Sequence, residues 1–476
     1  MISPRRAPAV GLALGLTILG VTLASSMRVD AMADFRAFWC GGVAIAQHAN
    51  PYLQQPLQRC EQLAGPPWEG PALAQVALPA PLPPFALLAY AALSPLPFPV
   101  AIAIYGLALA AAITVAIELL ARLTGAPTLA VAVVIAPIAW SDAVMRGQPF
   151  AFVLLALAAA AFFLQRSQPR VAALCLLGTA VQPHVALPAI LGALVLVPRM
   201  RLPLVAGSAA LGLLSVAATG LAVTVSYLRD VLPAHAVANA YEWQFSLTSL
   251  LTSAGVAVRT AIAAGSVTYG LMTLLGIVVA VVFVRRDGDL VPAVLIPPAF
   301  AVFLGVHVHY HQLALAFPAM LYVFVRSERW RPLAASALVV AMLPWDTIVV
   351  PALVAVWCVL AFAFGRYAFG PRAAMPIAAG TAAFAAAVTI VAFLHPALGA
   401  GAPPFVAHPY PAGALAEASW ADYSRQELSR ASPLLFALRA PTIVGIALGL
   451  AAVAGAAFAP HVAMRRTGRG TSLAEA

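Results

Sequence analysis

The chain has 476 residues, of which 63% are hydrophobic and only 9% are charged, and its mean hydropathy is +0.95. Soluble globular domains carry roughly a quarter charged residues, so this composition excludes a soluble enzyme or binding module. Apolar segments of about 17 to 25 residues recur along the chain without the alternation of a membrane β-barrel. We expect an all-α polytopic integral membrane protein, one domain over residues 1–476 with about 12 transmembrane helices.

The formal net charge of +10 would also suit a protein that binds nucleic acid. The arginines, however, occur in short clusters between apolar runs, which is the distribution of cytoplasmic loops. We therefore expect no nucleic-acid partner. The clusters assigned to the cytoplasm are Arg122; Arg166 and Arg170; Arg199 and Arg201; Arg285 and Arg286; Arg326, Arg329 and Arg331; Arg366 and Arg372; and Arg465, Arg466 and Arg469.

The N-terminus begins with two arginines, Arg5 and Arg6, followed by an apolar core over residues 8–26. This pattern fits a cleaved signal peptide, but the core is long enough to remain as a membrane anchor, which is the interpretation we favour. With the arginines inside, residues 27–80 form the first extracytoplasmic loop.

The same alternation predicts extracytoplasmic loops at residues 226–259 and 395–436, the latter with a short surface helix near Leu415 to Arg430. Residues 81–122 do not fit it. They contain two apolar runs, whereas the alternation needs an odd number of crossings. Either the proline-rich first run does not cross the membrane, or a neighbouring assignment is wrong.

Four cysteines are present, and two of them, Cys40 and Cys60, share the first extracytoplasmic loop. A disulfide can persist in that oxidising compartment. The sequence does not show whether the two Cα atoms come close enough, so a disulfide and two free thiols both remain open. Cys175 and Cys358 lie in apolar runs.

Two aspartates, Asp30 and Asp34, follow the first apolar segment in "RVDAMADFRAFW". If this stretch is helical, their i,i+4 spacing places both carboxylates on one face at the water boundary. The alternative is that they cap or solvate the loop.

The stretches Asp34-Phe-Arg-Ala-Phe-Trp, Gly41-Gly42, Asn50-Pro51-Tyr52, Pro83-Pro84-Phe85 and Arg146-Gly147-Gln148 occur in an order that resembles glycosyltransferase family 87. Members of this family are polyprenol-phosphate-mannose-dependent mannosyltransferases of the GT-C class. The resemblance covers roughly residues 8–330 and includes the region around Gln182-Pro183-His184, where many members have Lys-Pro.

The resemblance implies a GT-C fold in the bacterial cytoplasmic (inner) membrane, with the active site facing the periplasm or cell exterior. It implies a polyprenyl-phosphate-linked sugar as donor substrate, a glycolipid or glycan as acceptor, and no cofactor. Asp34 matches the family's acidic residue in the first outer loop. A carboxylate there can take the proton of the attacking sugar hydroxyl, so Asp34 is the expected general base and Asp30 the second candidate.

The leaving lipid phosphate needs donors in a poorly hydrated site, and arginine can bind it bidentately. Arg146 and Gln148 are the first candidates for this role and Arg36 is the next. The competing interpretation of Arg146 is a helix cap or an ion pair with Asp142.

Three histidines occur in "VHVHYHQ" at residues 306–312. On a helix His307 and His311 would share a face and His309 would point away. We expect His311 to take part in catalysis and His307 to bind phosphate; the alternative is that both face lipid headgroups. No His-Glu-x-x-His arrangement is present, so we expect no metal site.

Sugar or acceptor contacts are expected from Asp30, from Tyr52 and His184 in the family-like motifs, and from Glu242 and Gln244 in "YEWQFSLTSLL". Aromatic faces with a few hydrogen-bonding groups suit sugar rings. An interfacial aromatic belt is the alternative for this stretch. Trp345-Asp346 and residues 420–423 are weaker candidates of the same kind.

These observations predict an inverting membrane glycosyltransferase that moves a hexose, with mannose preferred, to an acceptor at the outer face. A transporter or flippase of lipid-linked sugars is the first alternative, but no duplicated halves are visible in the sequence. A non-catalytic subunit of an envelope assembly is the second.

Overall fold

The computed structural model describes residues 32–65, 75–138, 146–342, 351–370, 409–430 and 439–459, with a few positions between 379 and 386. Several features singled out in the sequence lie outside the described residues. They are Arg5, Arg6 and the anchor at residues 8–26; Asp30; Asp142; Trp345-Asp346; Arg372; and Arg465, Arg466 and Arg469.

Within these ranges the regular structure is helical, apart from one isolated antiparallel bridge between Leu53 and Leu415. The first half contains α2 (Ala33–Ala46), α3 (Gln54–Ala64), α4 (Pro84–Leu93), α5 (Phe98–Thr124), α6 (Thr128–Ile138), α7 (Phe150–Gln165), α8 (Pro169–Leu177), η3 (Gly178–Val181), α9 (Pro183–Leu196) and α10 (Pro198–Ser226). The second half contains η4 (Tyr227–Val231), α11 (Leu232–Ala240), α12 (Leu247–Ser253), α13 (Val258–Asp287), α14 (Pro292–Ala301), α15 (Tyr310–Leu313), α16 (Ala316–Arg326), α17 (Arg331–Ala341), α18 (Pro351–Phe369), α20 (Ala416–Arg430) and α22 (Ala440–Phe458).

Four helical runs in the described part of the chain are long and apolar enough to cross a membrane: α5, the continuous run from α10 to α11, α13 and α22. Six further apolar helices have only 10 to 17 residues. Several of these begin with proline or contain it, as in α14 with Pro297 and Pro298, and proline interrupts helical hydrogen bonding. The all-α membrane protein expected from composition is confirmed.

The ambiguous segment at residues 81–122 forms one short and one long helix. α4 has 10 residues, so it is about 15 Å long and reaches half-way through a hydrocarbon core of about 30 Å. α5 has 27 residues and is about 40 Å long. The proline-rich first run is therefore too short to cross, which agrees with the first of the two alternatives.

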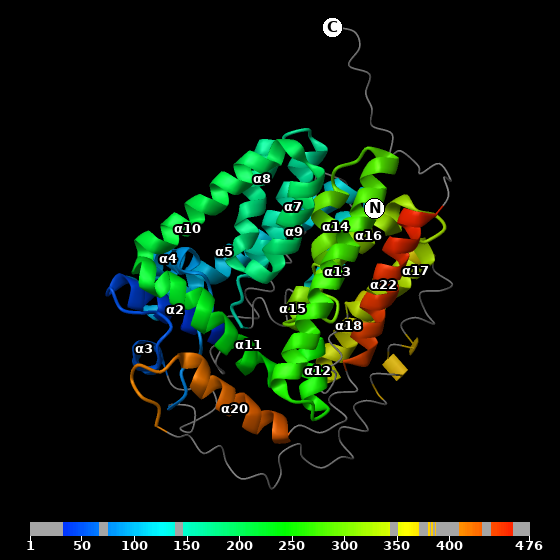
Figure 1. Cartoon of the computed structure of the whole chain (residues 1–476). Helices are drawn as coiled ribbons and strands as arrows, with labels where there is room; N and C mark the ends of the chain where they lie inside the picture. The colour runs from blue at the N-terminus through cyan, green and yellow to red at the C-terminus, as the bar shows by residue number, and fades with distance from the viewer. Residues whose placement is uncertain are drawn as a thin grey trace.

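Helices of this protein pack closely where glycine faces a neighbouring helix. A Cβ added at Gly42 of α2 would lie 2.4 Å from the backbone of α4, and one at Gly192 of α9 would lie 2.3 Å from the Ala293 carbonyl oxygen of α14. Such contacts are typical of helix packing in membranes, where close approach replaces the hydrophobic drive. In Figure 1, α10 lies at the upper left and α22 at the right, with α7, α9 and α14 between them.

The segment at residues 226–259, which the sequence predicts to lie on the extracytoplasmic side, is helical over most of its length. α10 continues through a π-helical turn at Tyr227–Val231 into α11, so the run ends only at Ala240. Of the polar side chains in this run, Arg229 and Asp230 lie at the surface, whereas Asn239 is buried. One kink interrupts the run at Gly220, where φ is +82°.

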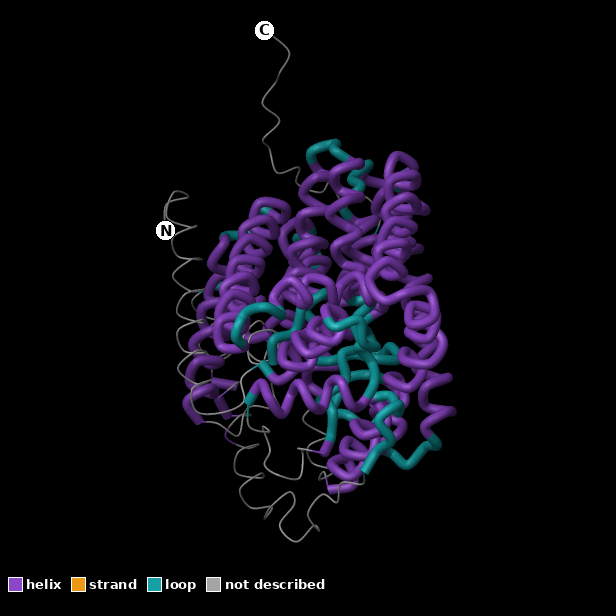
Figure 2. Tube along the Cα trace, turned by 90° about the vertical axis from the view of Figure 1, so that its left-hand side faces the viewer, coloured by secondary structure: helices purple, strands orange, loops and turns teal. Residues whose placement is uncertain are grey.

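Two segments far apart in the sequence lie together beneath the long helices. The Gln54 N–H donates to the Ala414 carbonyl at 2.8 Å, the Ala416 N–H donates to the Tyr52 carbonyl at 3.0 Å, and the Ser419 hydroxyl donates to Gln54 Oε1 at 2.8 Å. The predicted surface helix near Leu415 to Arg430 is confirmed as α20, beside α11 in Figure 1. Figure 2 shows many of the loops gathered in the same lower half.

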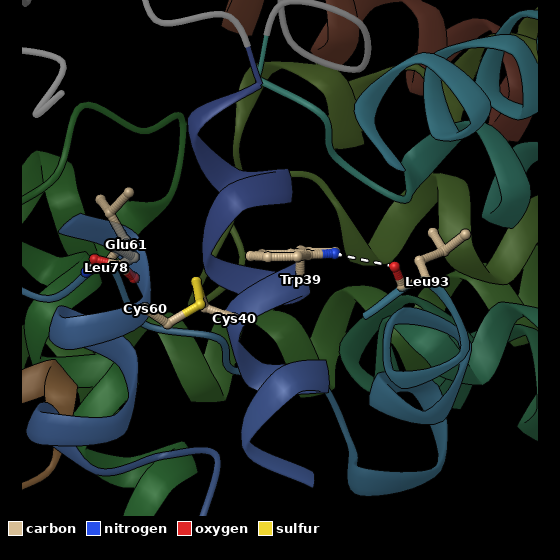
Figure 3. The surroundings of a disulfide bond; sticks show 6 residues. All are labelled: Trp39, Cys40, Cys60, Glu61, Leu78 and Leu93. Carbon is tan, nitrogen blue, oxygen red and sulfur yellow. Dashed lines mark hydrogen bonds between the residues drawn. A yellow bond between two sulfur atoms is a disulfide. The ribbon is translucent and has the colours of Figure 1, made fainter. Parts of the chain in front are cut away.

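The two loop cysteines form a disulfide, which settles the alternatives left open by the sequence. Cys40 on α2 and Cys60 on α3 have Cα atoms 5.6 Å apart. Figure 3 shows the bond with Glu61 beside it on α3; Glu61 Oε2 accepts the backbone N–H of Leu78 at 3.0 Å. On the other side of α2, Trp39 donates to the Leu93 carbonyl of α4 at 3.3 Å.

Candidate active site

A cavity of about 210 Å³ lies where α2, the 146–148 turn, the start of α9, α11, the 307–312 segment and α20 meet. Chain segments that are distant in sequence thus share one polar space. Seven of the residues expected at the site border it: Asp34, Arg146, Gln148, His184, Glu242, His307 and His311.

Asp34 lies in the first turn of α2, directly at the cavity. The helix starts after Met32, whose φ is +62°, and the N–H groups of Asp34 and Phe35 donate to the Arg146 carbonyl at 2.9 and 3.3 Å. Gln148 Nε2 donates to Asp34 Oδ2 at 2.5 Å. A helix N-terminus and an amide donor both favour an ionised carboxylate.

Steric constraints explain why a glycine occupies the middle position of Arg146-Gly147-Gln148. Its φ is +75°, and a Cβ there would lie 2.6 Å from the Cβ of Phe35. The Tyr105 hydroxyl donates to the Gly147 carbonyl at 3.0 Å. The turn is thereby pressed against the start of α2, which places Arg146 and Gln148 beside Asp34 at the cavity.

Glu242 is a second carboxyl group at this cavity. Its Oε1 accepts a hydrogen bond from Trp420 Nε1 of α20, and its Oε2 lies 3.6 Å from His309 Nε2. Burial raises the pKa of Glu242 above its ordinary value, the Trp420 hydrogen bond opposes this, and the charge of Asp34 adds to the rise. Asp34 and Glu242 therefore border the same cavity but have different hydrogen-bond partners and surroundings, which gives the two carboxyl groups different acid–base properties.

The histidine segment is not the helix that the spacing predicted. α15 begins only at Tyr310, and His309 is its N-cap, with its backbone N–H donating to Gln312 Oε1 at 2.9 Å. His307 and His309 lie in an irregular stretch that follows the left-handed Leu304. All three histidines of the segment border the cavity, so the expectation that His309 points away is wrong.

The buried side-chain amide of Gln244 holds His307 in place. Gln244 Oε1 accepts the Val308 N–H at 3.2 Å, which turns its Nε2 toward Asn239 Oδ1 at 2.8 Å and His307 Nδ1 at 3.3 Å. Gln244 thus lies behind the cavity wall. Burial lowers the pKa of His307 well below 6.5, and the imidazoles of His309 and His184 lower it further. His307 is therefore neutral at physiological pH.

Tyr52 and Arg36 lie away from the cavity. The Tyr52 hydroxyl donates to the Leu82 carbonyl at 2.8 Å, and its ring centroid is 5.4 Å from that of Tyr227, which borders the cavity. Arg36 lies near Glu61, whose pKa burial raises to about 8 while the Leu78 N–H and Arg36 oppose the rise. In this structure both residues support the wall from behind.

Sequence reasoning did not select four polar residues that border the cavity: Gln182, His235, Asn239 and Gln312. His235 and Asn239 lie on α11, inside a helical run apolar enough to cross a membrane. Polar side chains within such a run signal a functional site by default, and this signal was present in the sequence. Trp420, named only as a weaker candidate, closes one side through its bond to Glu242.

The histidine cluster raises the question of a metal ion. In the described ranges, no three His, Cys, Asp or Glu side chains are arranged to hold one. The rings of His184, His235 and His309 instead pack around His307, with centroid distances of 5.2, 5.5 and 4.7 Å. Nitrogens of His307 and His184 meet the amides of Gln244 and Gln312.

No protein-family model, no curated protein and no solved structure matches the chain.

Proposed function

We propose that this protein is a membrane glycosyltransferase of the GT-C type that transfers a hexose, with mannose preferred, from a polyprenyl-phosphate-linked donor. The acceptor is a lipid or glycan at the extracytoplasmic face of the bacterial cytoplasmic membrane. About twelve crossings of the membrane complete the proposed architecture. The observation that carries the proposal is the Asp34 carboxylate, fixed by Gln148 in a cavity that Arg146 and the histidines also border.

In the proposed reaction an acceptor hydroxyl attacks C1 of the donor sugar and its proton passes to Asp34. The bond between C1 and the phosphate oxygen breaks, and polyprenyl phosphate leaves with the electron pair. Attack opposite to the leaving group inverts the configuration at C1. Asp34 suits the base because its position in the first turn of α2 and the hydrogen bond from Gln148 fix its carboxylate at the cavity.

Negative charge develops on the phosphate as it leaves, and a preorganised cation lowers the cost of that charge. Arg146 is assigned this role, because the hydrogen bonds between its carbonyl and the first turn of α2 fix its backbone beside Asp34. His311 is 2% exposed and borders the same cavity. We assign it to the reacting groups and assign Glu242 and His184 to the sugar or acceptor.

The test is transfer of radiolabelled mannose from synthetic polyprenyl-phosphate-mannose by detergent-purified protein, with a panel of glycolipid acceptors. Asp34→Asn keeps the shape of the side chain but removes the base, so transfer should fall by about 10²- to 10⁴-fold. Asp230→Asn is the matched control, because Asp230 pairs with Arg229 on the surface away from the cavity.

Parallel reactions with EDTA determine whether transfer needs a divalent metal. Normal transfer by a folded Asp34→Asn protein would refute the assigned base. If intact wild-type protein transfers no polyprenyl-phosphate-linked hexose at all, transport of lipid-linked sugars becomes the better explanation of the cavity.

A further inference from the structure

Two buried polar groups at the cavity wall have no hydrogen-bond partner in the part of the chain that the structure describes. Gln182, at the N-cap of α9, is 5% exposed and its Oε1 accepts no hydrogen bond. His235 on α11 has a buried Nδ1 that is likewise unpaired. Buried polar atoms are nearly always paired in native proteins, so two such atoms beside one cavity require partners from a bound molecule, either water or a ligand with hydrogen-bonding groups.

The wall around these two groups is neutral. The rings of His184 and His235 flank His307 at centroid distances of 5.2 and 5.5 Å, and such crowding disfavours multiple positive charges. Gln312 Oε1 accepts the His309 N–H, so its amide nitrogen is the group that donates to His184 Nε2 at 2.7 Å. His184 is therefore an acceptor at Nε2 and a donor at Nδ1, and it carries no charge.

The chemistry of the missing partner follows from the unpaired atoms. An amide oxygen such as Gln182 Oε1 only accepts hydrogen bonds, so its partner must carry a donor. An ionised phosphodiester has no donor, and an apolar chain has neither donor nor acceptor. A sugar hydroxyl both donates and accepts, and it matches the amide oxygen and the neutral imidazole alike.

We propose that Gln182 and His235 bind hydroxyl groups of an uncharged hexose and make this wall the sugar subsite of the cavity. The inference rests on the proposed function and extends it, because it names the residues that recognise the sugar apart from the lipid phosphate. The charged groups Asp34 and Arg146 border the same cavity. The sugar of the donor then faces the imidazoles, and the phosphate faces the arginine.

The test compares equilibrium binding of two short-chain ligands, polyprenyl-phosphate-mannose and sugar-free polyprenyl phosphate, to the full-length protein in nanodiscs. Wild-type protein should prefer the mannosylated ligand. Gln182→Met and His235→Phe keep side-chain volume but lose the hydrogen bonds, so each should reduce this preference about tenfold. Their affinity for sugar-free polyprenyl phosphate should stay within about twofold, because no phosphate contact is lost.

His235→Asn keeps a hydrogen-bonding side chain and should retain part of the preference. The matched controls are Gln47→Met and His48→Asn, at exposed positions after α2; asparagine also tolerates the left-handed backbone of His48. Monodisperse elution of each variant in size-exclusion chromatography establishes that it folds.

An equal loss of affinity for both ligands, or no change for either, would overturn the assignment of Gln182 and His235. Wild-type protein that binds polyprenyl phosphate without preferring the mannosylated form would refute the sugar subsite and leave the lipid-phosphate site standing. Failure of wild-type protein to bind either ligand would refute the proposed function and the subsite together.

Discussion

Removing the Cys40–Cys60 disulfide should loosen one wall of the cavity as well as destabilise the fold. The bond joins α2, which carries Asp34, to α3. The residue after Cys60 is Glu61, whose carboxylate accepts the Leu78 N–H, and Leu78 borders the cavity. The disulfide therefore holds the chain segment that supports Leu78.

The size of the global effect follows from the length of the closed loop. The two cysteines are 20 residues apart in sequence, and the loss of chain entropy for a loop of this length is worth about 3 kcal/mol. The double variant Cys40→Ala/Cys60→Ala should lose about this amount of unfolding free energy. Denaturant titration of the detergent-purified protein measures the change.

A local readout distinguishes the proposed support of the cavity wall from a general loss of stability. Amide hydrogen exchange at Leu78 should accelerate in the double variant more than exchange in α13, which the disulfide does not contact. The matched control is Cys175→Ala/Cys358→Ala, which removes the two free cysteines. Unchanged stability, equal acceleration everywhere, or free thiols at Cys40 and Cys60 in wild-type protein would each refute the reasoning.

Three further changes test single features of the site. Burial raises the pKa of Glu61 to about 8, so the stability that its protonated form contributes is complete below pH 4.5 and is lost as the pH rises through 8. Glu61→Gln should match wild type at pH 5 and melt higher at pH 9 in thermal unfolding, with a gain of at most about 5 kcal/mol. Gly147→Ala forces a Cβ against Phe35 at a positive φ, so it should cost more than about 1 kcal/mol of stability and reduce mannose transfer. Trp420→Phe removes the donor to Glu242, so the pKa of Glu242 should rise and any limb of the transfer pH profile that Glu242 sets should move upward.

The membrane class and several elements were predictable because they depend on local composition. Apolar length identified α5 and α13, and a change to mixed charge identified α20. The irregular path of His307 and His309 was missed because a tertiary hydrogen bond between Gln244 and His307 and the local capping bond between the His309 N–H and Gln312 override the helical period.

Sequence predicted the candidate site only for those residues of the family-like motifs whose side chains border the cavity. Asp34 and Gln148 were both named from sequence, but the hydrogen bond between them joins positions 114 residues apart and is a tertiary fact. Tyr52 belongs to an equally prominent motif, yet its hydroxyl is used by the Leu82 carbonyl behind the wall. A motif residue can thus either support the wall of a site or take part in its chemistry, and the sequence does not distinguish these two roles.

One backbone contact couples the two groups that the proposed reaction needs most. The Arg146 carbonyl accepts the first N–H groups of α2, so the residue proposed to bind phosphate and the residue proposed as base share one rigid junction. Gly147 permits this junction, and Gln148 closes it through the Asp34 carboxylate. In-line transfer requires the attacking hydroxyl and the leaving phosphate to be held at a fixed separation about C1. The 146–148 turn holds both Arg146, proposed to bind the leaving phosphate, and Asp34, proposed to activate the attacking hydroxyl. It thereby meets this requirement without a separate positioning domain.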